Sequence, residues 1–255
     1  MSIHYTRAGQ GPALLLLHGI GSNCRSFRHQ LVQLADAFDV VAWDAPGYGR
    51  SDDPPPGAGL EYFADQAVGL LDELRIERAH VLGVSMGGVV AQLIYHRHPA
   101  RVVSLVLVDT NAGGGALPEP ARSERVRQRL SALERLGPRG MAEQRAPQLV
   151  RRVAPPALVA ELADIMAEVR PAGYKAAAVS LGATDLTSLL GEIGVPTLVV
   201  HGAEDAVVPL DTGRDLAAAI PNGRLTVIPD AGHVSNQEQP AAFNAAVRSF
   251  LTESR

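Results

Sequence analysis

Gly83-Val84-Ser85-Met86-Gly87 follows an apolar run, Arg78-Ala79-His80-Val81-Leu82, that is typical of a buried strand. The next segment, Met86 to Arg97, has helical periodicity and ends before Pro99. We therefore expect a sharp turn from strand to helix with Ser85 at its apex, in a strained backbone conformation. Glycines flank the serine because a side chain at either position would clash with neighbouring backbone. A serine held in this way is a candidate nucleophile.

A serine hydroxyl needs a base to remove its proton, and the base needs a carboxylate to orient it. Asp205 follows the strand candidate Thr197–Val200, and His233 follows the strand candidate Leu225–Ile228. The order Ser85, Asp205, His233 is that of one serine-hydrolase architecture and differs from the orders of the two large serine-protease folds. We expect Ser85 to attack, His233 to shuttle the proton and Asp205 to orient the imidazole.

Asp109 is an alternative partner for the histidine, because it also ends an apolar strand candidate, Val102–Val108. Asp205 is favoured because it lies in an Asp-x-x-x-Pro loop that ends at Pro209. In this interpretation Asp109 anchors the exit of the chain from the sheet.

An oxyanion hole is also required, since attack on a carbonyl creates a negative oxygen that must meet hydrogen-bond donors. The strand candidate Ala13–Leu17 leads into the glycine-rich loop His18-Gly19-Ile20-Gly21. The expected donors are the backbone N–H of Ile20 and that of Met86, which begins the helix after the serine. His18 is expected to brace this loop by hydrogen bonding rather than to act as the base.

Motifs in one order span nearly the whole chain: His18-Gly19, Asp44 to Asp52, Gly83 to Gly87, Asp205 to Pro209, and Gly232-His233 with Glu238-Gln239-Pro240. With this set the chain resembles the α/β-hydrolase superfamily. Within that superfamily it is most similar to the 3-oxoadipate enol-lactonase and carboxylesterase type. The segments that carry this finer likeness are Val169 to Tyr174, Thr184-Asp185-Leu186 and His233 to Pro240.

Two features depart from the superfamily pattern. Pro46 stands where many members have an arginine. The segment before the first buried strand is short, so part of the opening antiparallel hairpin is expected to be missing or abbreviated.

The predicted strands alternate with helical stretches, as in an α/β fold whose mostly parallel sheet has helices on both faces. The strand candidates are Ala13–Leu17, Val40–Trp43, Ala79–Leu82, Val102–Val108, Thr197–Val200 and Leu225–Ile228. A long interval precedes the last two strands and opens with Gly113-Gly114-Gly115. We predict an α/β-hydrolase core over residues 1–111 and 191–255, with a helical lid over residues 112–190 above the candidate site.

The predicted lid is rich in arginine: Arg122, Arg125, Arg127, Arg129, Arg135, Arg139, Arg145, Arg151 and Arg152. Some of these could bind an acidic substrate, but a solvated helix face is favoured because glutamates are interspersed. His96-Arg97-His98 has a spacing that can bind metal, but no cysteine or carboxylate cluster adjoins it in sequence. We expect no metal and no cofactor.

Composition agrees with an ordinary globular enzyme. The chain has 255 residues, 46% of them hydrophobic, and a formal net charge of −4, which predicts neither nucleic-acid nor membrane binding. Cys24 is the only cysteine, so no intrachain disulfide can form. The leucines at positions 14–17 are too few to span a bilayer, and the first ten residues lack a signal-peptide core. A cytoplasmic location is therefore expected.

The expected activity is hydrolysis of a small carboxylic ester or lactone through an acyl-enzyme. Three alternatives stay open: a carbon–carbon bond hydrolase acting on a ring-fission diketone acid, a perhydrolase, and a ligand receptor of low turnover. Carbon–carbon hydrolases of this kind commonly have a tryptophan soon after the histidine. Here Val234 to Gln237 follow it, and the only tryptophan is Trp43. Ester or lactone hydrolysis is accordingly favoured.

Overall fold

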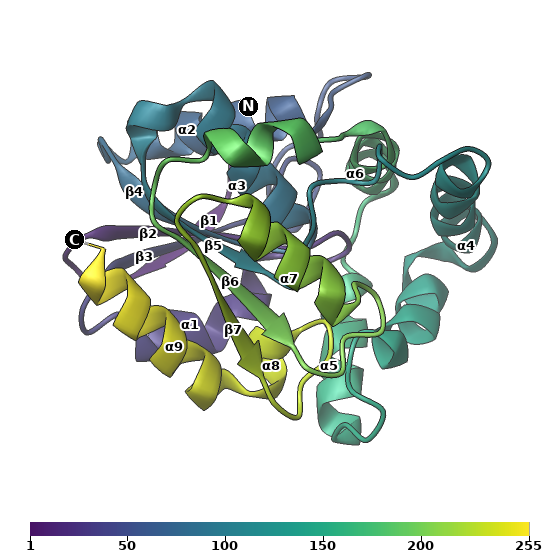
Figure 1. The fold of residues 1–255 in the computed structure, drawn as a ribbon. Coiled ribbons are helices and arrows are strands. Elements are labelled where there is room, and N and C mark those ends of the chain that lie inside the picture. The colour runs from purple at the N-terminus through teal and green to yellow at the C-terminus, as the bar shows by residue number, and fades with distance from the viewer. Residues whose placement is uncertain (255) are drawn as a thin grey trace.

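One seven-stranded sheet forms the centre of the protein, with strand order β1-β3-β2-β4-β5-β6-β7 (Figure 1). A computed structural model describes residues 1–254. The strands are β1 (Tyr5–Ala8), β2 (Ala13–Leu17), β3 (Asp39–Trp43), β4 (Ala79–Val84), β5 (Val102–Val108), β6 (Thr197–Gly202) and β7 (Gly223–Ile228). β1 pairs antiparallel with β3, and the other pairings are parallel. The carboxyl ends of β2 to β7 therefore meet at one edge of the sheet, which we call the sheet edge.

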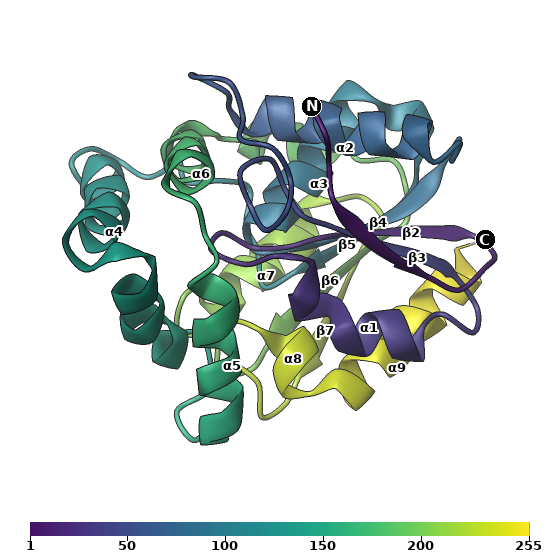
Figure 2. The same ribbon diagram turned by 180° about the vertical axis from the view of Figure 1, so that it is seen from behind.

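Helices cover both faces of the sheet. They are α1 (Arg28–Gln33), α2 (Leu60–Glu73), α3 (Met86–Arg97), α4 (Ala121–Arg145), α5 (Pro156–Met166), α6 (Pro171–Ala183), α7 (Leu210–Ala219), α8 (Ser235–Glu238) and α9 (Pro240–Glu253). Short 3₁₀ turns lie at Cys24–Phe27, Pro99–Arg101, Ala146–Gln148 and Thr187–Glu192. α2, α3 and α7 pack on one face and α1 and α9 on the other, as the two views show (Figures 1 and 2).

The strands are apolar on both sides because each face of the sheet packs on its own core. In β2, Leu15 and Leu17 belong to the core under α2 and α3, and Leu14 and Leu16 to the core over α1 and α9. All four are fully buried, and such burial contributes about 1.5–3 kcal/mol per leucine. This two-sided burial explains why the strands appear in the sequence as continuous apolar runs rather than alternating ones.

The predicted α/β architecture is confirmed, and each predicted strand lies within an observed strand. The sequence pattern does not predict β1 as a strand, and the resemblance predicts that part of the opening hairpin is missing or abbreviated. Its four residues include exposed Thr6 and Arg7, so they give no apolar signal. Pairing with β3 is what makes this segment extended.

Helices α4, α5 and α6 lie within the segment predicted as a lid and gather at one side of the molecule (Figure 1). Helical spacing relates Leu136 to the apolar residues Val126, Leu130 and Leu133, but Leu136 is 43% exposed. Gly137, with φ 65°, and Pro138 break the helix at that point, so the helical register is not continuous. Pro171 is the first residue of α6, a position at which proline is well tolerated. We call α4, α5 and α6 the cap helices.

Across the described part of the chain, no helix combines the length and the apolar character needed to cross a membrane.

Candidate active site

Ser85 lies at the predicted turn between β4 and α3, with φ 54° and ψ −116°. Its N–H donates to the carbonyl of Val108 at 2.8 Å, which holds the turn against the neighbouring strand. A Cβ atom at Gly83 would lie 2.1 Å from the carbonyl oxygen of Gly87, and one at Gly87 would lie 2.1 Å from that of Leu17. Both flanking glycines are therefore required by close backbone approach, and the strain at Ser85 is kept by the packing around it.

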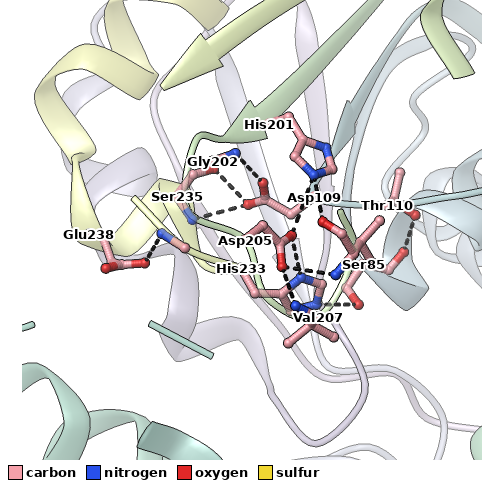
Figure 3. A network of polar contacts seen from close by, with 12 residues as sticks. Ser85, Asp109, Thr110, His201, Gly202, Asp205, Val207, His233, Ser235 and Glu238 are labelled. Atoms are coloured by element: carbon pink, nitrogen blue, oxygen red, sulfur yellow. Dashed lines mark hydrogen bonds and ion pairs between the residues drawn. The ribbon is translucent and has the colours of Figure 1, made fainter. Parts of the chain in front are cut away.

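The structure brings together the three side chains expected to cooperate (Figure 3). His233 Nε2 lies 2.9 Å from Ser85 Oγ, and His233 Nδ1 lies 2.8 Å from Asp205 Oδ2. The second carboxylate oxygen of Asp205 accepts the N–H groups of Val207 at 2.8 Å and Val208 at 2.9 Å. Asp205 and His233 are buried, and Ser85 is only partly so. These contacts make one continuous chain of hydrogen bonds from carboxylate to hydroxyl.

Asp109, the alternative acid, is not a hydrogen-bond partner of His233. One of its carboxylate oxygens accepts the N–H of Gly202 at 2.8 Å, and the other accepts the N–H of Ser235 at 3.1 Å and its hydroxyl at 2.7 Å (Figure 3). Asp109 is fully buried, and this burial raises its pKa. It therefore links the two loops that carry Asp205 and His233. The expected role was only to anchor the exit of the chain from the sheet.

His201 is a site residue that the sequence interpretation missed. Its Nε2–H donates to the carbonyl of Val208 at 2.9 Å and lies 3.6 Å from Asp205 Oδ2. The side chain is fully buried at the end of β6. The sequence signal that could have found it is its position. His201 lies at a strand end, four residues before Asp205, where the chain can fold back and bring the two side chains together.

Polar contacts tie the histidine loop to the chain that follows α4. The N–H of His233 donates to the carbonyl of Leu149 at 2.8 Å. The carboxylate of Glu238 accepts the N–H of Gly232 at 2.6 Å and that of Arg151 at 3.0 Å. The position of His233 is thus set by backbone hydrogen bonds from both sides.

The loop expected to supply the oxyanion donors lies against the serine. A Cβ atom at Gly19 would be 3.2 Å from Ser85 Cβ, and Ile20 lines the same cavity as Ser85. Met86 is the first residue of α3, where a backbone N–H has no partner within the helix. His18 lies behind this loop, with Nδ1 2.9 Å from the carbonyl oxygen of Gly19.

The bracing role expected for His18 is confirmed. Its Nε2 accepts the N–H of Ala45 at 3.0 Å, so Nδ1–H must donate to Gly19 and the imidazole is neutral. Burial lowers the pKa of His18, in agreement with that neutral form. With both nitrogens engaged by backbone groups, His18 has no free atom for proton transfer.

A cavity of about 60 Å³ opens beside Ser85 and His233. Ile20 and Val234 line it from the sheet edge, and Leu162 and Tyr174 line it from the cap helices. A wider groove of about 940 Å³ lies over α4 and shares Tyr174 with the cavity. A small organic substrate could therefore approach the serine between the sheet edge and the cap helices.

Two arginines of α4 contradict the expectation of a uniformly solvated face. Arg129 and Arg145 are half-buried and line the cavity at Ser85. Burial lowers the pKa of both guanidinium groups. The expectation is wrong for them because α4 turns one face toward the sheet edge, which periodicity alone could not orient.

Possible metal ligands occur in three places among the described residues. In one of them, formed by His4, Cys24 and Asp44, His4 Nδ1 lies 2.8 Å from Asp44 Oδ2 and Cys24 Sγ lies 3.6 Å from Thr6 Oγ1. His98, in the histidine pair with metal-like spacing, has its Nε2 2.8 Å from Asp65 Oδ1, and Arg97 pairs with the same carboxylate. Buried Asp109, His201 and Asp205 place ligand-type atoms within 4.8 Å of one another. Their hydrogen bonds to backbone groups and to His233 already use those atoms.

Comparisons with known proteins show the family to which the chain belongs. The family described as alpha/beta hydrolase fold matches residues 12–240. 3-Oxoadipate enol-lactonase 2 of Acinetobacter baylyi is 29% identical, over 98% of this chain and 93% of its own. A 2-hydroxy-6-oxononadienedioate/2-hydroxy-6-oxononatrienedioate hydrolase of Cupriavidus pinatubonensis is 33% identical, over 98% and 90%. A thermophilic esterase from Thermogutta terrifontis, solved with malate bound, superimposes with a TM-score of 0.91 at 31% identity, over 99% and 93%. The chain therefore belongs to the alpha/beta hydrolase fold family and is one of its hydrolases.

Proposed function

We propose that this protein hydrolyses a small carboxylic ester or lactone through an acyl-enzyme. The observation that carries the proposal is the unbroken hydrogen-bond chain from Asp205 through His233 to Ser85, with distances of 2.8 Å and 2.9 Å. A hydroxyl is a weak nucleophile unless a base is positioned to take its proton and a carboxylate orients that base.

In the first half of the reaction, Ser85 Oγ attacks the carbonyl carbon while its proton passes to His233 Nε2. Asp205 holds the Nδ1–H and stabilises the imidazolium that forms. The N–H groups of Ile20 and Met86 stabilise the negative oxygen of the tetrahedral intermediate. The intermediate collapses when the C–O bond to the leaving alcohol breaks and His233 returns its proton to that oxygen.

The second half repeats these steps with water. His233 takes a proton from a water molecule while the water oxygen attacks the acyl carbon. The bond between that carbon and Ser85 Oγ then breaks, and His233 donates the proton to Ser85 Oγ. The products are a carboxylic acid and the free enzyme. For a lactone, the acid and the alcohol remain in one molecule.

A carbon–carbon bond hydrolase is the second candidate, favoured by the 33% identity to the Cupriavidus hydrolase. Ester or lactone hydrolysis is preferred because the residues after His233 include no tryptophan. Instead Val234, Asn236 and Gln237 line the cavity. The similarity to an enol-lactonase and to an esterase supports the same choice.

Steady-state kinetics across esters, lactones and ring-fission diketones will test the proposal, with Ser85→Ala as the control. We expect the best ester or lactone to exceed the best diketone in kcat/KM, and all turnover to depend on Ser85. A diketone preferred by tenfold or more, about 1.4 kcal/mol of transition-state stabilisation, would favour the second candidate.

A further inference from the structure

Three arginines of α4 have acidic partners. The ion pairs are Arg122 with Glu119, Arg127 with Glu124, and Arg139 with Asp164, at 2.8, 2.6 and 2.7 Å. Each of these charges is neutralised by its partner, including that of Arg122, which also lines the smaller cavity beside Ser85. Ion pairs with exposed partners contribute little to stability.

Arg125, Arg129 and Arg145 differ, and we call them the arginine cluster. Within residues 1–254, none of the three has a carboxylate partner. Arg145 donates to the side-chain amide oxygen of Gln148 at 2.6 Å, and Arg125 reaches the carbonyl of Val207 at 3.5 Å. Arg129 has no hydrogen bond or ion pair among the described side chains. The cluster is thus a concentration of positive charge without an ion-pair partner, although Asp205 lies near enough to Arg145 to act on it electrostatically and Glu204 lines the wider groove.

This cluster lies around the proposed nucleophile. Arg129 and Arg145 line the cavity at Ser85 and His233, and Arg125 and Arg129 line a smaller cavity of about 40 Å³ on another side of Ser85. Among the described lining residues of these two cavities there is no carboxylate. All three arginines also line the wider groove over α4. An entering ligand would therefore meet guanidinium groups next to the reacting hydroxyl.

In the absence of an anion, the arginine cluster lowers the stability of the folded protein through burial of charge and repulsion between like charges. Arg129 is half-buried, and its burial together with the nearby charges of Arg125 and Arg145 lowers its pKa. An arginine stays protonated even so, because its ordinary pKa lies above about 12. Like charges brought together away from water are stabilised when a carboxylate or another anion pairs with them.

We propose that the arginine cluster, with Arg129 at its centre, binds a carboxylate group of the substrate, so that the preferred substrates are anionic esters or lactones. The reaction part of this inference rests on the proposed function, whereas anion binding does not. A guanidinium can hold a carboxylate through two parallel N–H···O bonds, which fixes the orientation of the acyl group as well as its charge.

Two esters that differ only at the end of the acyl chain test the proposal. Monoethyl glutarate carries a carboxylate where ethyl pentanoate carries a methyl group. We expect wild-type kcat/KM to favour the anionic ester by tenfold or more at low ionic strength, with the preference falling as salt is added. In Arg129→Gln the ratio of kcat/KM for the anionic ester to kcat/KM for the neutral ester should fall at least tenfold, mainly through a higher KM for the anionic ester.

Arg127→Gln is the matched control, because Arg127 is two residues away on the same helix, exposed and paired with Glu124. Its ratio should equal that of the wild type. Arg145→Gln should lower the ratio less than Arg129→Gln, since Arg145 lines only one of the two cavities. Thermal unfolding of each variant will show that the comparison is made on folded protein.

Binding of monoethyl glutarate to Ser85→Ala, measured by calorimetry, separates the two proposals. One outcome is Ser85-dependent turnover of the neutral ester with no preference for the anionic ester and no binding of it. That outcome would overturn the anion-binding role of the arginine cluster and leave the proposed ester hydrolysis intact. Binding that is lost on adding Arg129→Gln, without Ser85-dependent turnover of either ester, would retain the anion site and reject the proposed function. Absence of both turnover and binding would reject both.

Discussion

The sheet edge and the cap helices enclose the same cavity but are held in place by different interactions. At the sheet edge, Ser85, Asp109 and Asp205 are fixed by backbone hydrogen bonds, and glycine backbones approach one another closely. In the cap, α4 is broken at Gly137 and its exposed charges pair locally. The proposed function assigns the reacting groups to the sheet edge, and we propose that the cap determines what reaches them.

The largest expected effect tests the sheet edge. Ser85→Ala should reduce the rate on the order of 10⁴-fold or more, because the three proposed catalytic groups act as a unit. A fluorophosphonate should label Ser85 stoichiometrically, as peptide mass spectrometry can establish. Labelling at another residue, or turnover near that of the wild type in the variant, would remove the sheet edge as the site of chemistry.

A second, smaller effect distinguishes two carboxylates of the sheet edge. Asp205→Asn should lower kcat by ~10³- to 10⁴-fold, since the amide cannot hold the imidazole in the required tautomer. Asp109→Asn should cost about 1–3 kcal/mol of unfolding free energy, because an amide NH₂ would face backbone N–H donors, and should lower kcat far less. Denaturant unfolding and steady-state kinetics on both variants decide the matter. A greater kcat loss in Asp109→Asn would transfer the proposed role to that residue.

The last prediction compares glycines of the two regions and includes the smallest expected effect, that of Gly137→Ala. Gly83→Ala should destabilise the protein by about 3 kcal/mol or more, since the new Cβ would lie 2.1 Å from the carbonyl oxygen of Gly87. Gly137→Ala in the cap meets no atom within 4 Å, and only its φ of 65° resists the change, at about 1–2 kcal/mol. Equal losses of unfolding free energy for the two variants would contradict the difference in packing.

Much of the fold and of the candidate site could be predicted from local sequence. The turn at Ser85 depends on neighbouring glycines and on a strand and helix that adjoin it, all within a few residues. The position of Asp205 and of His233 after buried strands follows from apolar runs of ordinary length. β1 could not be predicted in this way, because Tyr5–Ala8 becomes a strand only through its pairing with β3.

The sequence by itself determined the α/β architecture, the order Ser85, Asp205, His233 and the glycines that the turn requires, because strand burial and turn geometry depend on local side chains and backbone. The Asp-x-x-x-Pro loop favoured Asp205 over Asp109, and the tertiary structure placed Asp205 against His233. Only the tertiary structure showed that His201 contacts the loop that carries Asp205. It also decided which arginines of α4 face Ser85 and which face solvent. The physical reason is that these choices depend on contacts between residues far apart in the chain, which no local periodicity specifies.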